Sequence, residues 1–496
     1  MKYYKIITFF FIIFAFVLTS CTKLDEELYE KIPGDQYPEN DAQVANLSVA
    51  AYKRLETLAD DNGWWFLAQE ISSDELCAPT RGSDWFDGGK WLDVHRHSWS
   101  NDTESVNRMW SAFWDGITTS NQILDMLRQI ESTDAIISKM AEVEVLRSFY
   151  YYLLLDNYGD VPYLITANVP DNFQPEKVNR EIVYDSLITT VERSLPYLRT
   201  SDNKYMATRN MAFALLAKLY INSEVYIGTA NWAKASQYCD SVMAGPYSLA
   251  SDVKAPFVTE NQNSSEIIFS IPFDEDNFQG FRLHMRTLHY QHNTTYDMPV
   301  GPWNGFAVVP THFDTYEEND LRREAHFIWG PQFSADGSEI IESITGEPLD
   351  IDPHLPGLEM VDGYTDAQIR TTGARIKKYE IKMGAKENLS NDFPLFRLSD
   401  FYLMKAESEI RLGNNGDDWV NPIRTRAGVD PFNGCTLDQI LEERGREMFV
   451  EGHRRQDLIR FNKWQNSWWE KAAHGAEQNT FPIPQWAIDA NPNLGK

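Results

Sequence analysis

Cysteine is scarce in this sequence, with 4 residues in a chain of 496. Cys77, Cys239 and Cys435 are far apart and form no CxxC pair. This spacing indicates neither a disulfide framework nor a zinc site. A chain of this length can bury a hydrophobic core large enough to fold without disulfide bonds or a structural zinc ion.

Basic residues are also few, since 45 Lys and Arg stand against 73 Asp and Glu and leave a formal net charge of -28. Such an acidic surface repels phosphate backbones, which excludes nucleic acid as a partner. Neutral sugars and peptides remain possible ligands. Aromatic residues, by contrast, make up 13% of the chain and include 15 Trp, whose rings both fill cores and stack on sugar rings.

Long apolar runs are almost absent from the sequence. The exception is residues 9–18, which follow two lysines and are too short to span a bilayer, as is typical of a secretion signal. The next residues, Leu18-Thr19-Ser20-Cys21, resemble the lipobox of bacterial lipoproteins, in which the cysteine is acylated. We therefore predict a signal peptide at 1–20 and a lipid anchor at Cys21. The alternative is a signal cut elsewhere, with Cys21 an ordinary thiol.

A polar stretch at 21–40 contains Pro33, Gly34 and Pro38 and is predicted to act as a lipidated tether. The remaining residues, 41–496, are predicted to form a single domain. That domain begins with a helical pattern at 42–58.

Helical periodicity dominates much of the chain and predicts a mainly α fold. Apolar residues recur every three or four positions in the segments 104–131, 135–157, 180–199, 208–224 and 232–243. The last two resemble a tetratricopeptide-like helical pair. Helices return at 400–412, with Ser399 as a cap, and at 437–450, where Thr436 and Gln439 have the spacing of a capping box.

Two stretches lack this period. Residues 60–103 are rich in Asp, Gly, Ser and Trp and are predicted to be loops. Residues from about 250 to 397 are short apolar runs between Pro, Gly and Asn clusters. The sequence therefore predicts a helical scaffold at about 104–243 and 400–464, with a loop-rich insertion at about 250–397.

Four blocks of sequence resemble those of a known family. They are 141–153 running into Tyr158-Gly159-Asp160-Val161-Pro162, 397–407 followed by Arg424-Thr425-Arg426-Ala427-Gly428, 442–460, and Phe481-Pro482-Ile483-Pro484 with Asn491-Pro492. Together with the lipobox, they are similar to the SusD/RagB family of outer-membrane nutrient-binding lipoproteins.

This resemblance implies a SusD-like fold, in which inserted loops on a tetratricopeptide-like scaffold bind the ligand. Members of the family capture oligosaccharides, or oligopeptides in some cases, and act as a lid on a SusC-like TonB-dependent transporter. The resemblance thus implies a surface-exposed protein, anchored by lipid to the outer membrane, that breaks no bond.

A surface glycoside hydrolase is the alternative. Glu442, Glu443, Glu447 and Glu451 lie among arginines, a pattern more typical of ion networks that fix helix packing than of paired catalytic carboxylates. The sequence contains no GxSxG, HExxH or GxxxxGK[ST] motif. We therefore predict that the protein is not an enzyme.

Potential metal ligands do not have the spacing of a complete metal site. His95 and His97 have no third ligand at a useful spacing, and Asp336-Gly337-Ser338-Glu339 lacks the remaining positions of a calcium loop. No cofactor is predicted, although a structural calcium remains possible.

Two loops combine aromatic rings with the polar groups that fix sugar hydroxyls. The predicted ligand-binding residues are Arg81, Asp84, Trp85, Trp91, Trp303, Asn304 and Arg375, with Asp314, Tyr316 and Asp392 as neighbouring candidates. The tryptophan rings either stack on a sugar or plug their loops against the scaffold, and the sequence leaves both roles open.

Overall fold

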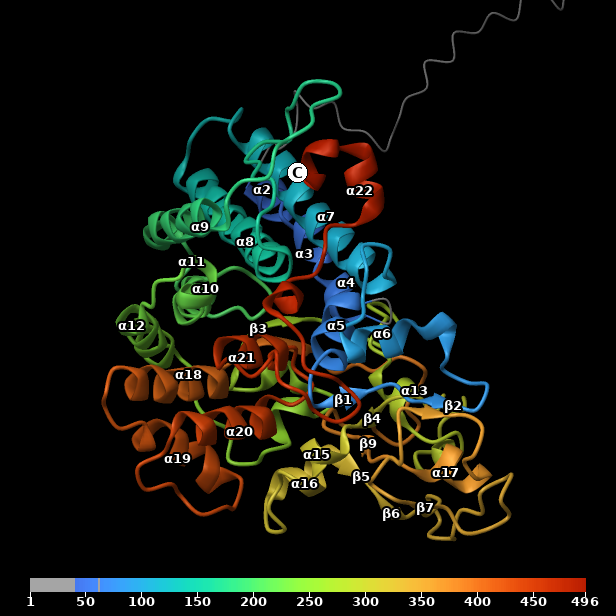
Figure 1. Ribbon diagram of the computed structural model, residues 1–496. Coiled ribbons are helices and arrows are strands. Elements are labelled where there is room, and N and C mark those ends of the chain that lie inside the picture. The colour runs from blue at the N-terminus through green and yellow to red at the C-terminus, as the bar shows by residue number, and fades with distance from the viewer. Residues whose placement is uncertain (1–40, 61–62) are drawn as a thin grey trace, which may run out of the picture. The chain divides into compact units, whose positions relative to one another are not determined.

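The computed structural model describes residues 41–60 and 63–496 (Figure 1). The predicted signal peptide, the acylated Cys21 and the tether lie outside these residues. The chain divides into two units, with the boundary between Asn46 and Leu47. The described part of the first unit is a short helix, α2 (Asp41–Asn46), and the second unit contains the elements that follow.

Successive helices pack against each other to form a scaffold. They are α7 (Glu104–Leu127), α8 (Asp134–Tyr158), α9 (Arg180–Ser194), α10 (Arg209–Ile221) and α12 (Trp232–Met243). Helix α8 lies between α7 and α9, and α10 packs on α12. The helices predicted between residues 104 and 243 are thus confirmed, with ends that differ by a few residues.

The C-terminal helices extend this scaffold through the contact of α12 with α18 (Figure 1). They are α18 (Leu398–Arg411), α19 (Asp417–Arg426), α20 (Leu437–Met448) and α21 (Arg454–Arg460). Thr436 and Gln439 form the predicted capping box of α20. The cap predicted at Ser399 is wrong: Arg397 is the N-cap of α18, and the Ser399 hydroxyl donates to the buried Glu266 carboxylate.

The insertion is built from short strands. Its longest ladder pairs β3 (Ile267–Ile271) antiparallel with β10 (Phe393–Arg397), which joins the two ends of the insertion. The other ladders are β1 (Leu76–Cys77) with β4 (Ala307–Val308), β2 (Thr80–Arg81) with β8 (Glu359–Met360), β5 (Phe327–Ile328) with β9 (Arg375–Ile376), and β6 (Gly330–Pro331) with β7 (Asp350–Ile351). Strands β1 and β2 therefore fasten the segment before α7 to the insertion.

Short helices fill the spaces between these elements. They are α3 (Val49–Lys53), α4 (Glu56–Ala59), α11 (Ser223–Ile227), α13 (Leu283–Thr287), α14 (His292–Thr295), α15 (Pro310–Phe313), α16 (Leu321–His326), α17 (Asp366–Thr371) and α22 (Gln485–Ala490). The single helix predicted at 42–58 is wrong, because that stretch is divided among α2, α3 and α4. Among the described residues, no helix has the length and apolar character needed to cross a membrane.

The loop predicted at residues 60–103 is also wrong in part, because this stretch contains α5 (Trp64–Ile71) and α6 (Lys90–Arg96). Every residue of α5 is buried, so its sequence lacks the one-sided apolar period of a surface helix. Helix α6 directly follows Gly88 and Gly89, which both have positive φ and end the loop before it.

A buried network of charges joins the C-terminal helices to the insertion. Glu443 lies 2.8 Å from both Arg322 and Arg424, and Glu447 lies 2.8 Å from Arg397. Although burial opposes its ionisation, the neighbouring arginines lower the pKa of Glu443 to about 2. The ion network predicted for this block is confirmed.

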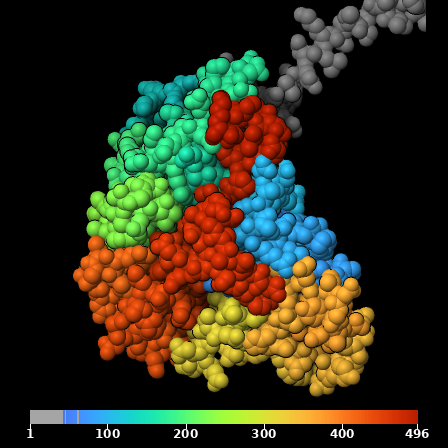
Figure 2. All heavy atoms as spheres, viewed as in Figure 1, coloured from blue at the N-terminus to red at the C-terminus, as the bar shows by residue number. Residues whose placement is uncertain are grey.

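The C-terminal segment crosses between the scaffold and the region of α5 and α6. Figure 2 shows this segment, in red, with green residues on one side of it and blue residues on the other. The Phe481 N–H donates to the Asn157 carbonyl at 2.7 Å, and the Gln485 N–H donates to the Asn101 carbonyl at 3.0 Å. Both faces of the crossing are therefore fixed by backbone hydrogen bonds.

Candidate functional site

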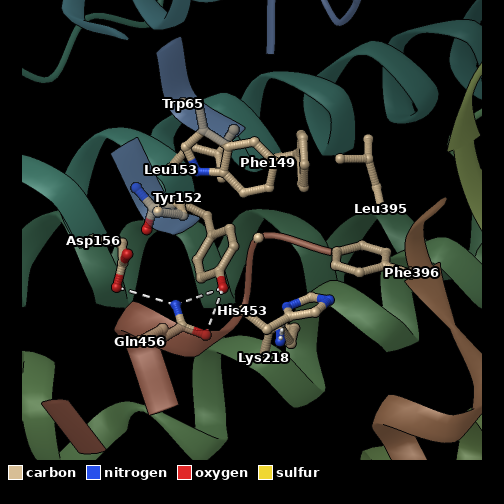
Figure 3. A pocket seen from close by; sticks show the side chains of 12 residues that line it. Trp65, Phe149, Tyr152, Leu153, Asp156, Lys218, Leu395, Phe396, His453 and Gln456 are labelled. Carbon is tan, nitrogen blue, oxygen red and sulfur yellow. Dashed lines mark hydrogen bonds between the residues drawn. The ribbon is translucent and has the colours of Figure 1, made fainter. Parts of the chain in front are cut away.

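A small cavity lies inside the scaffold, enclosed by α5, α8, α10, β10 and the start of α21 (Figure 3). The Gln456 amide donates to the Tyr152 hydroxyl at 2.7 Å and to Asp156 at 3.1 Å along one wall. The cavity volume is about 20 Å³. That volume holds about one water molecule, whereas pockets for small ligands measure about 300–1,000 Å³. A sugar does not fit here.

An open hollow of about 610 Å³, which we call the aromatic groove, lies on the surface beside α6 and α13. It is lined by Trp64, Asp84, Trp85, Asp87, Lys90, Trp91, Glu104, Arg286, Tyr290, Pro302 and Trp303. These residues come from α5, the loop before α6, α6, the start of α7 and residues 286–303 of the insertion. The groove thus unites both loops that the sequence singled out.

The loop between β2 and α6 presents Trp85 at the groove. Trp85 has a φ of 63° and Asp87 a φ of 46°, the left-handed region that side chains other than Asn and Asp seldom adopt. The Trp85 indole N–H donates to the Trp303 carbonyl at 2.8 Å. Both tryptophan side chains are half-buried, so each keeps part of its ring accessible to a ligand.

The Trp85 ring lies directly on the backbone of Gly305. A Cβ atom at Gly305 would fall 2.2 Å from the Trp85 ring, so only glycine allows this contact. Asn304 beside it has a φ of 51°. Asn tolerates this conformation, whereas Trp85 is strained in it, and strained residues cluster at functional sites.

Buried rings form the floor beneath Trp85. Trp91 is 2% exposed and stacks on Trp64, with ring centroids 5.3 Å apart, and the Phe306 ring lies 5.5 Å from Trp91. The Trp91 indole N–H donates to Asp87 at 2.8 Å. Trp91 therefore supports the groove and turns only a small part of its surface to it.

Charged and hydroxyl groups rim the aromatic surface. Arg286 lies over the Trp85 and Trp303 rings at 6.0 and 5.8 Å, and Lys90 lies 4.8 Å from the Trp91 ring. The Tyr290 hydroxyl donates to Asp84. Partial burial, together with this carboxylate, raises the pKa of Tyr290 to about 12. Tyr290 is therefore a neutral hydroxyl at physiological pH.

Three of the predicted ligand-binding residues are buried behind the groove. Arg81 is 3% exposed and donates to the carbonyls of residues 369 and 372, while Arg375 is 0% exposed and donates to the Asn304 side chain at 2.7 Å. Burial lowers the pKa of Arg81 to about 10, which leaves it charged at neutral pH. Arg81, Asn304 and Arg375 hold the two loops together, and their burial argues against direct contact with a ligand.

The neighbouring candidates lie elsewhere. Asp314 pairs with His354, Tyr316 is buried against Phe327, and Asp392 accepts a hydrogen bond from Tyr205. None of the three lines the aromatic groove.

Sequence reasoning missed several groove residues, notably Trp64, Lys90, Glu104, Arg286 and Tyr290. Trp64 lies in a stretch interpreted as loop, and Arg286 and Tyr290 lie in the insertion without any local motif. Of these residues, only Lys90 had a signal in the sequence, because it is the direct neighbour of the predicted ligand-binding residue Trp91.

Among residues 41–60 and 63–496, no cluster of three His, Cys, Asp or Glu side chains has the geometry of a metal site. His95 instead faces the Trp469 carbonyl, and His97 faces the Ser72 carbonyl and His474. The Asp336 carboxylate accepts hydrogen bonds from Ser338.

Two family models match the chain. The model described as "Starch-binding associating with outer membrane" matches residues 30–221, and that of the SusD family matches residues 363–496. The starch-binding protein SusD of Bacteroides thetaiotaomicron is 24% identical over 458 residues, which cover 80% of this chain and 79% of that protein.

Solved structures share the fold. Surface glycan-binding protein A from Bacteroides thetaiotaomicron, in complex with laminarihexaose, superposes with a TM-score of 0.73 at 23% identity and covers 92% of this chain and 98% of its own. A SusD superfamily protein from Parabacteroides distasonis gives a TM-score of 0.75 at 19% identity, covering 93% and 98%. The tetratricopeptide-like fold predicted from the sequence is thereby confirmed, and the chain belongs to the SusD-like family.

Proposed function

We propose that this protein binds oligosaccharides in the aromatic groove and delivers them to a SusC-like TonB-dependent transporter in the outer membrane. The observation that carries the proposal is the pairing of Trp85 and Trp303, whose half-buried rings come from distant segments and share one open hollow. Exposed indole faces stack on the C–H faces of sugar rings. The names of the relatives, which bind starch and laminarihexaose, support the same class of ligand.

Polar groups of the groove suit sugar hydroxyls. Asp84 and Glu104 supply carboxylate acceptors, and the Tyr290 hydroxyl both donates and accepts. Carboxylates beside an aromatic face accept hydrogen bonds from sugar hydroxyls and thereby orient a sugar ring that is stacked on that face. The first alternative function is import of an oligopeptide in place of a sugar. The second is that of a surface glycoside hydrolase.

The proposal includes surface attachment through the lipidated Cys21 and a tether at 21–40, with residues 41–496 as one ligand-binding domain. It includes no enzymatic activity, in keeping with relatives that are named as binding proteins. Mass spectrometry of the N-terminal peptide from outer membranes tests the anchor, because an unmodified Cys21 would contradict it.

Binding is tested by affinity electrophoresis and calorimetry with soluble starch and laminarihexaose as probes. Replacement of Trp303 by Ala removes one stacking face and is expected to weaken binding about tenfold, which corresponds to about 1.4 kcal/mol. The control is Trp486→Ala, which removes an indole that is 50% exposed on α22, outside the groove.

Unchanged affinity in the Trp303 variant would place the ligand elsewhere. Release of reducing ends from either probe would favour the hydrolase. If peptides bind and neutral glycans do not, the oligopeptide alternative replaces the proposal.

A further inference from the structure

A pair of histidines clamps α6, the helix that carries Lys90 and Trp91 of the groove. His97 ends this helix with a φ of 56°, and its side chain is buried. Its Nδ1 atom lies 2.6 Å from Nε2 of His474, which belongs to a segment at 465–474 that we call the C-terminal hairpin. The two rings are in contact although 377 positions separate them.

The outer nitrogen of each ring faces a carbonyl. Nε2 of His97 lies 2.7 Å from the Ser72 oxygen, and Nδ1 of His474 lies 2.7 Å from the Gly475 oxygen. A carbonyl oxygen only accepts hydrogen bonds, so both outer nitrogens must carry hydrogen. A neutral imidazole has one N–H, which leaves a lone pair on each of the two inner nitrogens. One additional proton is therefore needed between His97 and His474 to make their contact favourable.

Aromatic rings surround the pair. The His97 ring lies 4.1 Å from the Trp464 ring and 4.6 Å from the Trp99 ring. Their faces favour a cation. Burial and the nearby Lys471 act against the cation: burial lowers the pKa of His97 to about 2 and also lowers that of His474.

Further charged groups lie around the two histidines. Lys471 on the hairpin donates to the carbonyls of residues 464 and 466, and burial lowers its pKa to about 8. The remaining neighbours are His95 on α6, Asp74 after α5, Arg455 on α21 and Glu477 after the hairpin. The aromatic faces favour the protonated histidine pair, whereas burial and the nearby cations disfavour it. The shared proton is therefore weakly bound and is lost as the pH rises.

The hairpin holds α6 at further points. His95 faces the Trp469 carbonyl at 2.9 Å, and Arg96 lies 3.4 Å from Glu470. Trp469 packs against the apolar cluster that contains Leu92. Movement of the hairpin would thus release the helix on which Trp91 and Lys90 are placed.

We propose that His97 and His474 form a proton-dependent latch that positions α6 and thereby tightens the groove as the pH falls below about 6, the lower part of the ordinary histidine range. The latched state binds one more proton than the open state, so acid favours it. The effect on ligand affinity rests on the proposed function, whereas the latch itself does not.

The test compares the full chain in detergent with two variants at pH 4.5 and 7.0. His474→Gln places an amide donor at the position of Nε2, which satisfies Nδ1 of His97 without an added proton. His354→Gln is the matched control, because His354 is half exposed and pairs with Asp314 outside the latch. Selective ¹⁵N-histidine spectra report the protonation of the pair, and calorimetry with laminarihexaose and soluble starch reports affinity.

We expect the two imidazoles of the wild type to lose one shared proton between these pH values. Affinity should be weaker at pH 7.0 than at pH 4.5 by at least about fivefold, the lower end of typical coupling between sites. The substitution His474→Gln should abolish this pH dependence, and His354→Gln should retain it. Independent titration of the two rings, or equal pH dependence in wild type and His474→Gln, would overturn the latch. Shared titration without any glycan binding would support the latch and contradict the proposed function.

Discussion

At the scale of single residues, the groove depends on the close approach of one ring to one backbone. Trp85 in a left-handed conformation packs on Gly305 and donates its indole hydrogen to the Trp303 carbonyl at 2.8 Å. The two rings therefore hold each other in place. Rigid placement before binding lowers the entropy lost when a ligand is stacked.

Replacement of Gly305 by Ala is expected to displace the Trp85 ring, because the new Cβ would meet it at 2.2 Å. We expect about tenfold weaker binding of laminarihexaose or soluble starch, or about 1.4 kcal/mol, measured by calorimetry. Gly301→Ala is the control, since its Cβ would have its nearest neighbour at an ordinary 3.6 Å. Equal affinities in the two variants would show that the position of Trp85 is unimportant.

At the scale of elements, α7 and α8 approach closely because α7 has a glycine where they cross. Gly116 faces the Tyr150 ring, and a Cβ there would lie 2.4 Å from a ring atom. The Tyr150 hydroxyl donates to the Ala51 carbonyl at 2.7 Å, so the ring is also fixed at its far end. The helix pair thus has little room to adjust.

Replacement of Gly116 by Ala should destabilise the protein by about 1–3 kcal/mol, the usual effect of overpacking a core. This loss is expected even though Ala favours helix formation over Gly. Urea unfolding followed by circular dichroism measures it. Thr118→Ala on the exposed side of the same helix should change stability by less than about 0.5 kcal/mol. A stabilised Gly116 variant would mean that α7 and α8 can separate at little energetic expense.

At the scale of the whole molecule, a buried ionisable group makes stability depend on pH. Glu70 in α5 is 0% exposed and accepts a hydrogen bond from the Gly452 N–H at 2.6 Å. Burial raises its pKa from 4.5 to about 8. Between these values the folded chain keeps a proton that the unfolded chain has lost, so stability falls as the pH rises through this range.

Replacement of Glu70 by Gln retains the acceptor oxygen and removes the ionisation. We expect the variant to gain stability over the wild type as the pH is raised from 4.5 to 8, by at most about 1.4 kcal/mol per pH unit. Urea unfolding at several pH values measures this difference. Glu442→Gln, which changes a side chain that is 61% exposed, should show no such trend. A constant difference between the Glu70 variant and the wild type would contradict the raised pKa.

The sequence by itself determined the helices of the scaffold and the family. Apolar spacing in α7, α8, α9, α10 and α12 is a local property, since each stripe is formed by residues within one helix. The capping box of Thr436 and Gln439 is local in the same way. Local patterns of this kind can be read without knowing what packs against them.

Only the tertiary structure decided which of the predicted residues reach the groove surface. Trp85 and Trp303 remain half-buried there, but Arg81 and Arg375 are covered because segments far along the chain supply the carbonyls and the amide that they bind. Trp64, the first residue of α5, lines the groove beside residues of the insertion more than 200 positions away. Burial depends on contacts between distant segments, so no local pattern in the sequence can specify it.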